Sequence, residues 1–287
     1  MTIAYIVLAH KNPRQVARLV HALADEDAAF YLHVDSKTPP TEYRELVAGV
    51  EDIGDLHHLP RVRTHWGGFG LVEATLAGIE RIAARRPVPS YTVLLTGQDY
   101  PIKSRRFIRE FFEAHDGSSF VHYAPLPWQA WGPDGGFSRI ESWHWPQRFL
   151  GRHLSFPNKH VRVPLRRRFP RGLHPFGGYQ HWCLARRSVE YLAAAVEERP
   201  DVVSFFRHVY IPDETLIPTL LLNSPLRDTI TRDDLKLVRW GEDRRIPHPR
   251  VLTAEDFDDI ASAPDLYARK FDTALDARIL DLIDERL

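Results

Sequence analysis

The stretch TIAYIVLAHKNPRQVARLVHALADEDAAFYLHVD, residues 2–35, carries the signals of a strand, a helix and a second strand. Residues 3–9 form a continuous apolar run, which is typical of a parallel strand buried on both faces. Pro13 stands where a helix would begin, and residues 30–34 form a second apolar run that ends at Asp35. This order predicts the start of an α/β fold. Between the two runs, apolar residues recur at helical spacing, and they are Val16, Leu19, Val20 and Leu23.

The alternation of strands and helices continues through the first half of the chain. Residues 69–84 show helical apolar spacing, and residues 91–96 form another apolar strand. The next helix and strand are predicted over residues 107–112 and 120–122. We therefore expect a single α/β domain over residues 1–287, with a doubly wound, mostly parallel sheet flanked by helices.

Residues 124–178 interrupt this pattern, and we expect an irregular insertion there. The segment holds many prolines and a basic run from Arg162 to Arg171. It also holds four of the tryptophans, Trp128, Trp131, Trp143 and Trp145. A long irregular segment inside a compact domain is usually functional or mobile.

Regular structure is predicted again after residue 178. Residues 179–184 suggest a strand, followed by a helix to Val196. Asp213 and Glu214 follow a proline and stand where another helix would begin. The last predicted elements are a strand over residues 235–240 and a helix over residues 273–287.

Composition excludes several classes of protein. Lys plus Arg and Asp plus Glu both total 38, so no global charge favours a nucleic-acid partner. The single cysteine, Cys183, excludes an intrachain disulfide and a cysteine-based zinc cluster, and it fits a reducing compartment. The apolar run at the N-terminus is too short for a signal segment, and no window approaches the roughly 20 apolar residues of a membrane span. We expect a cytoplasmic protein.

Polar residues follow three predicted strands directly. His10, Asp35 and the residues 97–99 stand at such strand ends. Parallel sheets of this kind bind ligands at the carboxyl ends of their strands. No glycine-rich dinucleotide or phosphate loop follows the first strand, so a dinucleotide cofactor is not expected. The strand ends are instead placed where a nucleotide could reach them.

The segment YTVLLTGQDYPIKS, residues 91–104, bears on the need for a metal ion. In many nucleotide-sugar transferases a strand ends in Asp-x-Asp, which holds a divalent cation against the donor diphosphate. Here Asp99 is the only acid at the strand end, and the Asp-x-Asp-like triplets at residues 25–27 and 256–258 fit solvated charge better. Without a metal, arginine or lysine must balance a diphosphate leaving group. The candidates are the run from Arg162 to Arg171, Arg250 and Lys270, although each taken alone is more often a solvated surface cation.

The segment FFRHVYIPDETLIPTLLLNS, residues 205–224, offers two neighbouring acids at a predicted helix start. A carboxylate there can be a helix-terminal charge or cap. It can also be a general base that removes the proton from an acceptor hydroxyl. The residues alone leave both interpretations open.

The chain resembles the core-2/I-branching N-acetylglucosaminyltransferase family, glycosyltransferase family 14, which also includes peptide xylosyltransferases. The matching segments follow the family's order over nearly the whole chain, and that ordered set is specific. They are AYIVLAHKNPRQVARLVHAL, FYLHVDSK, THWGGFGLVEATLAGI, YTVLLTGQDYPIKS, GYQHWCLARRSVEYL, HVYIPDETLIPTLLLNS, HPRVLTAEDF and PDLYARKFD.

The resemblance implies a GT-A-like fold and an inverting transfer of a sugar, GlcNAc or xylose first, from a UDP-sugar without a metal or other cofactor. It implies that Glu214 is the general base. Lys270 and Arg250 would bind the donor diphosphate, with Arg239 and Arg245 as alternatives to Arg250. The other expected donor-binding residues are His10, Asp35, Gln98 and Asp99, and the expected acceptor-binding residues are Glu141, Trp143, Trp182 and Asp213.

The resemblance also divides the expected domain by function. Residues 1–123 would form a nucleotide-binding half. Residues 179–287 would form the acceptor-binding and catalytic half, ending in a tail that binds the diphosphate. The insertion over residues 124–178 lies between them.

The chain departs from the animal members of the family, since it lacks their membrane anchor, stem and disulfide cysteines. We therefore expect a bacterial-type member, whose acceptor is a cell-surface polysaccharide intermediate, a lipid-linked oligosaccharide or a glycosylated natural product. Two rival interpretations remain open. One is an inactive protein that binds sugar nucleotides. The other is a polysaccharide-assembly protein at the inner membrane face, with the run from Arg162 to Arg171 on anionic lipid.

Overall fold

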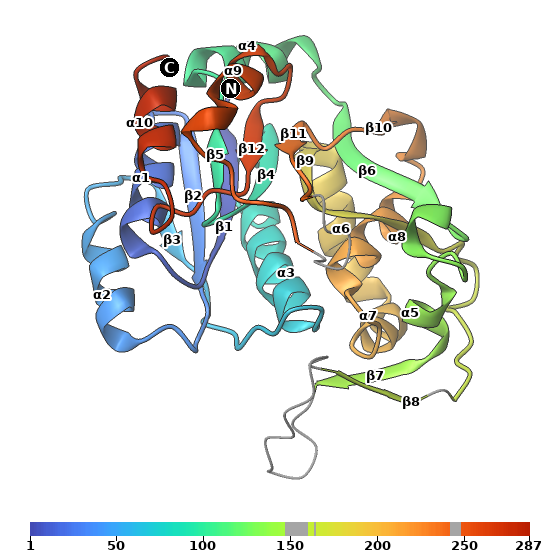
Figure 1. The fold of residues 1–287 in the computed structure, drawn as a ribbon. Helices are drawn as coiled ribbons and strands as arrows, with labels where there is room; N and C mark the ends of the chain where they lie inside the picture. The colour runs from blue at the N-terminus through green and yellow to red at the C-terminus, as the bar shows by residue number, and fades with distance from the viewer. Residues whose placement is uncertain (147–159, 164, 242–247) are drawn as a thin grey trace. The chain divides into compact units, whose positions relative to one another are not determined.

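The computed structural model describes residues 1–146, 160–163, 165–241 and 248–287 (Figure 1). This part of the chain divides into two compact units. The first unit comprises Met1–Leu59, Pro89–Asp116 and Leu235–Leu287, and the second comprises Pro60–Val88 and Gly117–Asp234.

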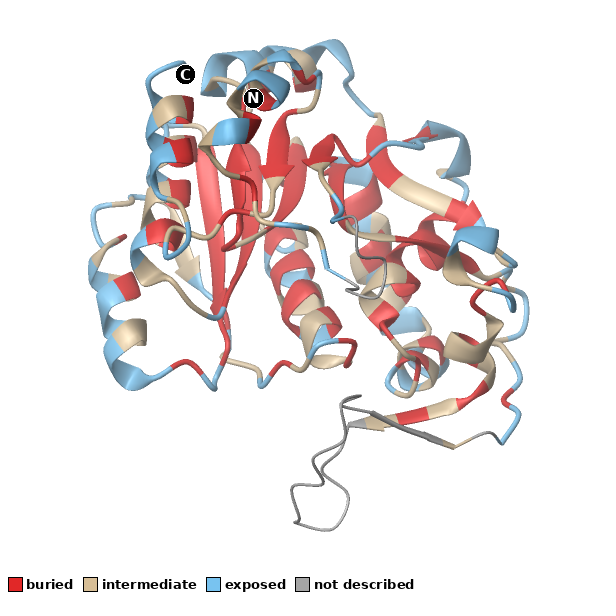
Figure 2. Ribbon diagram, viewed as in Figure 1, coloured by how far each residue is buried: buried red, intermediate tan, exposed pale blue. Residues whose placement is uncertain are grey.

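A parallel sheet forms the centre of the first unit. Its strands are β1 (Ile3–Ala9), β2 (Ala28–Val34), β3 (Leu56–His58) and β4 (Tyr91–Thr96). Strand β1 pairs with both β2 and β4, and β2 pairs with β3, in each case in parallel. Every residue of β1 and β2 is buried, as the continuous apolar runs predict (Figure 2).

The first helix of the first unit lies where the sequence predicts it. Helix α1 (Pro13–Leu23) begins at the predicted proline, and its apolar face is buried. It is followed by α2 (Pro40–Ala48), and α4 (Arg105–Ala114) begins after Ser104, whose hydroxyl accepts the backbone N–H of Phe107. The C-terminal part contains the short helix η4 (Ala254–Asp256), α9 (Phe257–Ser262) and α10 (Arg278–Asp284).

The last helix is shorter than the predicted one over residues 273–287. Asp276 accepts the backbone N–H groups of Arg278 and Ile279 and also that of Ala254. The carboxylate therefore satisfies donors at the start of α10 and fixes a turn before it, so the helix begins at Arg278.

A second, three-stranded sheet in the first unit gathers segments distant in sequence. It consists of β5 (Asp99–Pro101), β11 (Lys236–Val238) and β12 (Tyr267–Arg269). Strand β12 is parallel to β11 and antiparallel to β5, with Arg269 opposite Asp99. This pairing brings the end of β4 next to the C-terminal tail.

The second unit contains three further paired strands and most of the remaining helices. Strand β6 (Ser119–Pro125) pairs antiparallel with β9 (Phe176–Ala185) and parallel with β10 (Ile230–Thr231). The expected α/β class, with mostly parallel strands flanked by helices, is thus confirmed. The helices of this unit are α3 (Gly70–Ala83), α5 (Phe137–Glu141), α6 (Arg186–Glu198), α7 (Pro200–Phe206) and α8 (Leu216–Leu222), with the short 3₁₀ helices η1 (Gln129–Trp131), η2 (Pro212–Glu214) and η3 (Arg227–Thr229).

The described part of residues 124–178 contains short regular elements that the sequence does not predict. Besides η1 and α5, the segment contains the antiparallel pair β7 (Trp143–Pro146) and β8 (His160–Val163), and β9 begins before residue 178. These elements are too short to show a period in the sequence. A Cβ atom would lie 2.4 Å from the Trp131 ring if it were added to Gly136, and 2.3 Å from it if added to Gly177. The two glycines therefore leave room for this ring.

The part of the chain that the structure describes contains no helix long and apolar enough to cross a bilayer. Cys183 lies buried in β9.

Candidate active site

The strand-end residues of the first unit lie where the sequence predicts them. His10 follows β1 and Asp35 follows β2. Asp35 is buried, and its carboxylate accepts the backbone N–H of Lys37 at 2.8 Å and lies 3.4 Å from the Lys37 ammonium. The His10 ring remains exposed at this edge of the sheet.

Lys270 lies directly after β12 and is part of the same cationic region. Burial lowers the pKa of its ammonium, and the charges of Lys11 and Arg269 lower it further, against the opposing effect of Asp272. Lys11 is paired with Asp272 at 2.6 Å. Among the described residues, Lys270 has no carboxylate partner of its own.

The same region depresses the pKa of His10. Burial contributes most, followed by Lys11, and Lys37 and Lys270 add to the effect, whereas Asp35 opposes it. Desolvation is the largest cause of both shifts, and the charges of the neighbouring basic residues that add to it indicate a positive local potential. We name His10, Lys11, Lys37 and Lys270 the cationic cluster. Its chemistry suits an anionic ligand at the carboxyl ends of β1 and β2.

Asp99 has a different environment from the one that the sequence suggests. Its side chain is fully buried, and it accepts the backbone N–H of Thr96 at 2.6 Å. Lys236 lies 2.9 Å and Arg269 3.2 Å from its carboxylate oxygens. These two cations neutralise Asp99 and join β5 to the rest of its sheet, so the structure does not offer this carboxylate to a nucleotide. The neighbouring Gln98 is also largely buried, and its backbone carbonyl accepts the N–H of Phe271 at 2.8 Å.

Arg250 already has an anionic partner. Its guanidinium donates to both carboxylate oxygens of Asp256, and these hydrogen bonds raise the pKa of Arg250. A donor diphosphate would have to compete with Asp256 for it. Of the two alternatives, Arg239 lies 3.3 Å from Asp259, and Arg245 falls outside the described residues.

The second unit carries the predicted base. Glu214 ends the 3₁₀ helix η2, and its side chain is 25% exposed. Its carboxylate accepts a hydrogen bond of 2.7 Å from Arg139, on α5. The guanidinium of Arg139 lies 3.7 Å from the centre of the Trp131 ring, and its backbone carbonyl accepts the N–H of Tyr210 at 3.1 Å. Arg139 is therefore held from two sides as it contacts Glu214.

Asp213 lies beside Glu214 in a less favourable environment. Its Oδ1 atom is buried, and no described residue forms a hydrogen bond with it. Burial and the neighbouring charge of Glu214 raise the pKa of Asp213 to about 7. Burial also raises the pKa of Glu214, but Arg139 acts in the opposite direction. Within the pair, the contact with Arg139 favours the charge on Glu214 and the proton on Asp213.

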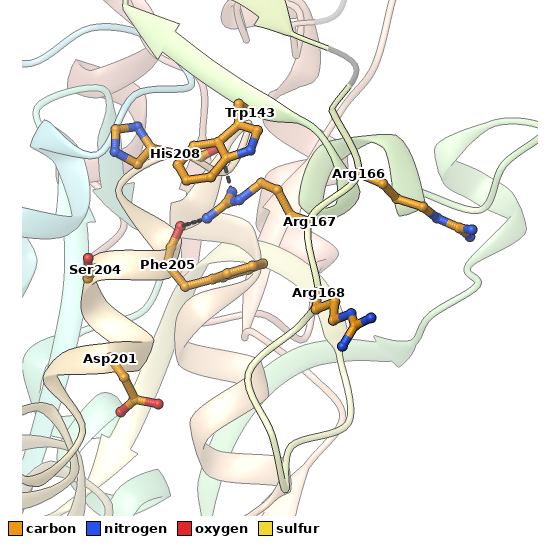
Figure 3. A pocket seen from close by; sticks show the side chains of 8 residues that line it. All are labelled: Trp143, Arg166, Arg167, Arg168, Asp201, Ser204, Phe205 and His208. Carbon is orange, nitrogen blue, oxygen red and sulfur yellow. Dashed lines mark hydrogen bonds between the residues drawn. The ribbon is translucent and has the colours of Figure 1, made fainter.

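The other predicted acceptor-binding residues differ in exposure. Trp182 on β9 is 1% exposed, so it belongs to the core and its ring is not available to a sugar, contrary to our expectation. Glu141 at the end of α5 carries an exposed carboxylate, 3.6 Å from Arg166. Trp143 on β7 is partly exposed and lines an open pocket of the second unit (Figure 3).

Arg139 was not among the residues selected from the sequence. It stands 75 positions before Glu214, and nothing in the local pattern joins the two. The one feature of the sequence that could have pointed to Arg139 is its place in the segment from Arg139 to Trp143. The ion pairs of Asp99 were missed for the same reason.

The described fold belongs to the α/β class, and each of its two units carries a group of side chains with its own chemistry. One unit offers cations for an anionic ligand, and the other offers a carboxylate able to take a proton. The family model of the Core-2/I-Branching enzyme matches residues 3–261. The chain belongs to this family, a family of glycosyltransferases, as its sequence segments indicate.

Two relatives from animals illustrate the similarity. The chain is 24% identical to xylosyltransferase 1 of Canis lupus familiaris over 98% of its own length and 30% of that protein. It is 25% identical to xylosyltransferase 2 of Rattus norvegicus over 99% of its own length and 33% of that protein. The chain thus spans about a third of the length of these relatives.

A solved structure, mouse xyloside xylosyltransferase 1 in its apo form, covers 93% of this chain at 11% identity. The alignment includes 97% of that chain and has a TM-score of 0.39. A likeness of this degree adds no argument about the reaction.

Proposed function

We propose that this protein is an inverting glycosyltransferase that moves a sugar from a UDP-sugar to a hydroxyl of a glycan or glycosylated acceptor without a metal ion. GlcNAc and xylose are the first donor sugars to test. The observation that carries the proposal is the Glu214 carboxylate held by Arg139 beside the buried Asp213, in a chain of this family.

Glu214 supplies the proton acceptor for a single displacement. The acceptor oxygen forms a bond to the anomeric carbon as the bond from that carbon to the diphosphate oxygen breaks. The hydroxyl proton goes to Glu214, and UDP leaves with the bonding electron pair. The contact with Arg139 orients the Glu214 carboxylate and favours its ionised form against the effect of burial. A protonated Asp213 avoids a second negative charge at this position.

Lys270 supplies positive charge for the leaving diphosphate. In the cationic cluster, Lys11 is paired with Asp272 and Lys37 with Asp35, whereas Lys270 has no carboxylate partner among the described residues. A cation without a counterion loses no existing ion pair when it binds a phosphate oxygen. Its charge therefore stabilises the negative charge that develops on the leaving oxygen.

The environment of Asp99 supports a reaction without a metal ion. This acid stands at the strand end where an Asp-x-Asp motif would hold a cation. Lys236 and Arg269 neutralise it within the protein. A divalent ion would have to displace both cations to use this carboxylate.

The experiment is a screen of donors by UDP release. UDP-GlcNAc, UDP-xylose, UDP-glucose and UDP-galactose are each incubated with the full chain and a panel of glycan acceptors, with and without EDTA. We expect one donor to be consumed in an acceptor-dependent manner and at an unchanged rate in EDTA. Binding of UDP without release from any donor would instead assign the protein to the inactive sugar-nucleotide-binding class.

A further inference from the structure

An open pocket in the second unit brings three consecutive arginines together with aromatic side chains (Figure 3). Arg166, Arg167 and Arg168 approach it from the segment after β8, and Phe205 comes from α7. Trp143 completes the aromatic wall. The pocket has a volume of about 540 Å³, within the range of sites that bind small ligands.

Arg167 is a buried cation with an incomplete set of partners. Its side chain lies between two rings, 4.4 Å from the centre of Trp143 and 3.9 Å from that of Phe205. Its guanidinium donates to the backbone carbonyls of His208 and Phe205 at 2.9 and 2.5 Å. No carboxylate contacts it in the part of the chain that the structure describes, and burial lowers its pKa to about 10. A buried charge without a counterion is costly, and an anion in the pocket would offset that cost.

The charge balance around Arg167 remains positive. Arg166 and Arg168 are both exposed. Asp201, the acid that lines the pocket, is engaged by Arg199 through both carboxylate oxygens at 2.9 Å. Arg166 has a loose contact of 3.6 Å with Glu141 in an exposed setting, where an ion pair contributes little.

The pocket is continuous in the chain with the partner of the predicted base. Arg139 lies on α5, and Trp143 begins the next strand, four residues later. The backbone N–H of His144 donates to the carbonyl of His208 at 3.0 Å, which ties β7 to the segment that leads to Glu214. A ligand in the pocket therefore lies against the same short segment that positions Glu214.

We propose that this pocket binds the carboxylate of an acidic sugar residue in the acceptor glycan. The planar guanidinium fork matches a carboxylate in geometry, and aromatic rings with the Ser204 hydroxyl suit the rest of a sugar. A pocket of about 540 Å³ has room for a sugar residue, a ligand of defined size, which favours this ligand over a bilayer surface. The role as an acceptor site rests on the proposed glycosyl transfer, whereas the binding itself does not.

The test measures binding in the absence of any donor. The full chain is titrated calorimetrically with a tetrasaccharide that contains glucuronate and with the same tetrasaccharide after reduction of its carboxyl groups. We expect the acidic form to bind at least about tenfold more tightly, the scale of one charge-assisted contact. Arg167 is left unchanged, because its stacked side chain also supports the local packing.

Two variants of the exposed arginines make the test specific. The double change Arg166→Ala with Arg168→Ala should weaken binding of the acidic tetrasaccharide about tenfold or more. Arg171→Ala removes an exposed arginine of the same run that does not line the pocket, and it should bind within about threefold of the wild type.

Equal binding of the two tetrasaccharides, or an equal loss in Arg171→Ala, would overturn the proposal. Sedimentation with phosphatidylserine vesicles adds a further arm. The arginines would serve a membrane surface instead if three results occurred together. The vesicles would bind the wild-type chain, the double variant would not bind them, and the two tetrasaccharides would bind equally. If the acidic sugar binds as expected but no donor releases UDP, the pocket stands and the proposed transfer fails.

Discussion

The substitution Glu214→Gln tests the proposed base most directly. The amide has the shape of the carboxylate, and its oxygen can still accept the hydrogen bond from Arg139, which is 2.7 Å long in the wild type. What it loses is the capacity to take a proton. Removal of a general base typically slows a reaction by about 10²–10⁴-fold, so kcat should fall by that factor. The residues proposed to bind the UDP-sugar lie in the other unit, so the affinity for UDP should stay within about threefold of the wild type.

The assay pairs UDP release, with the best donor and acceptor of the screen, with calorimetric titration of UDP. Glu190→Gln is the matched control, because it makes the same change at an exposed position of α6. The pH profile adds a second measurement. Burial raises the pKa of Glu214, so the wild-type rate should rise with pH through a value above the usual range of a glutamate. This rise should be absent in the residual activity of Glu214→Gln. A Glu214→Gln enzyme within about threefold of the wild-type kcat would refute the assignment.

The remaining predictions concern the metal, the donor and the acid pair. Activity should survive excess EDTA, and a complete loss that manganese restores would contradict metal independence. Lys270→Ala should weaken UDP binding about tenfold to a hundredfold in calorimetry, since it removes a charge-assisted contact. Arg250→Ala should have a smaller effect, because Asp256 already engages that arginine. The reverse order of the two effects would show that Arg250 is the main ligand of UDP. The raised pKa of Asp213 lies above its unfolded value, so its contribution to stability is present at low pH and is lost as pH rises to about 7. In denaturant unfolding, Asp213→Asn and the wild type should therefore have the same free energy of unfolding near pH 3. Above pH 7 the variant should be more stable by at most about 4 kcal/mol. An equal difference at both pH values would argue against a buried, protonated Asp213.

Much of the first unit could be predicted from local pattern. The apolar run over residues 91–96 corresponds to β4 in full, and Pro13 marks the start of α1. The positions of His10 and Asp35 followed from the rule that ligand-binding residues stand at the carboxyl ends of parallel strands. The three-residue strands β5 and β12 could not be predicted, because they are too short to show a period and depend on pairing with distant segments.

Local sequence also predicts some residues of the candidate site but not the contacts between them. Glu214 could be selected because it stands in a segment shared with the family. Its partner Arg139 could not, because their contact joins two segments far apart in sequence. Asp99 was taken as a ligand residue from its place at a strand end, but its neutralisation depends on Lys236, which lies 137 positions later. Local sequence predicts which side chains reach a strand end, and tertiary pairing decides whether they remain available.

The tryptophan at position 131 also matters to anyone who would engineer this protein. Glycine-to-alanine changes are a common route to higher thermostability, and a survey of the chain that ignored backbone conformation and packing would include Gly136, whose φ is +89°, and Gly177. At these two positions the added methyl group would collide with the indole, whose ring also lies against Arg139. A stabilisation campaign that included them would displace the indole and, with it, the guanidinium that orients Glu214. The resulting loss of turnover would look like a defect in chemistry, although its origin would be a steric clash with an aromatic ring.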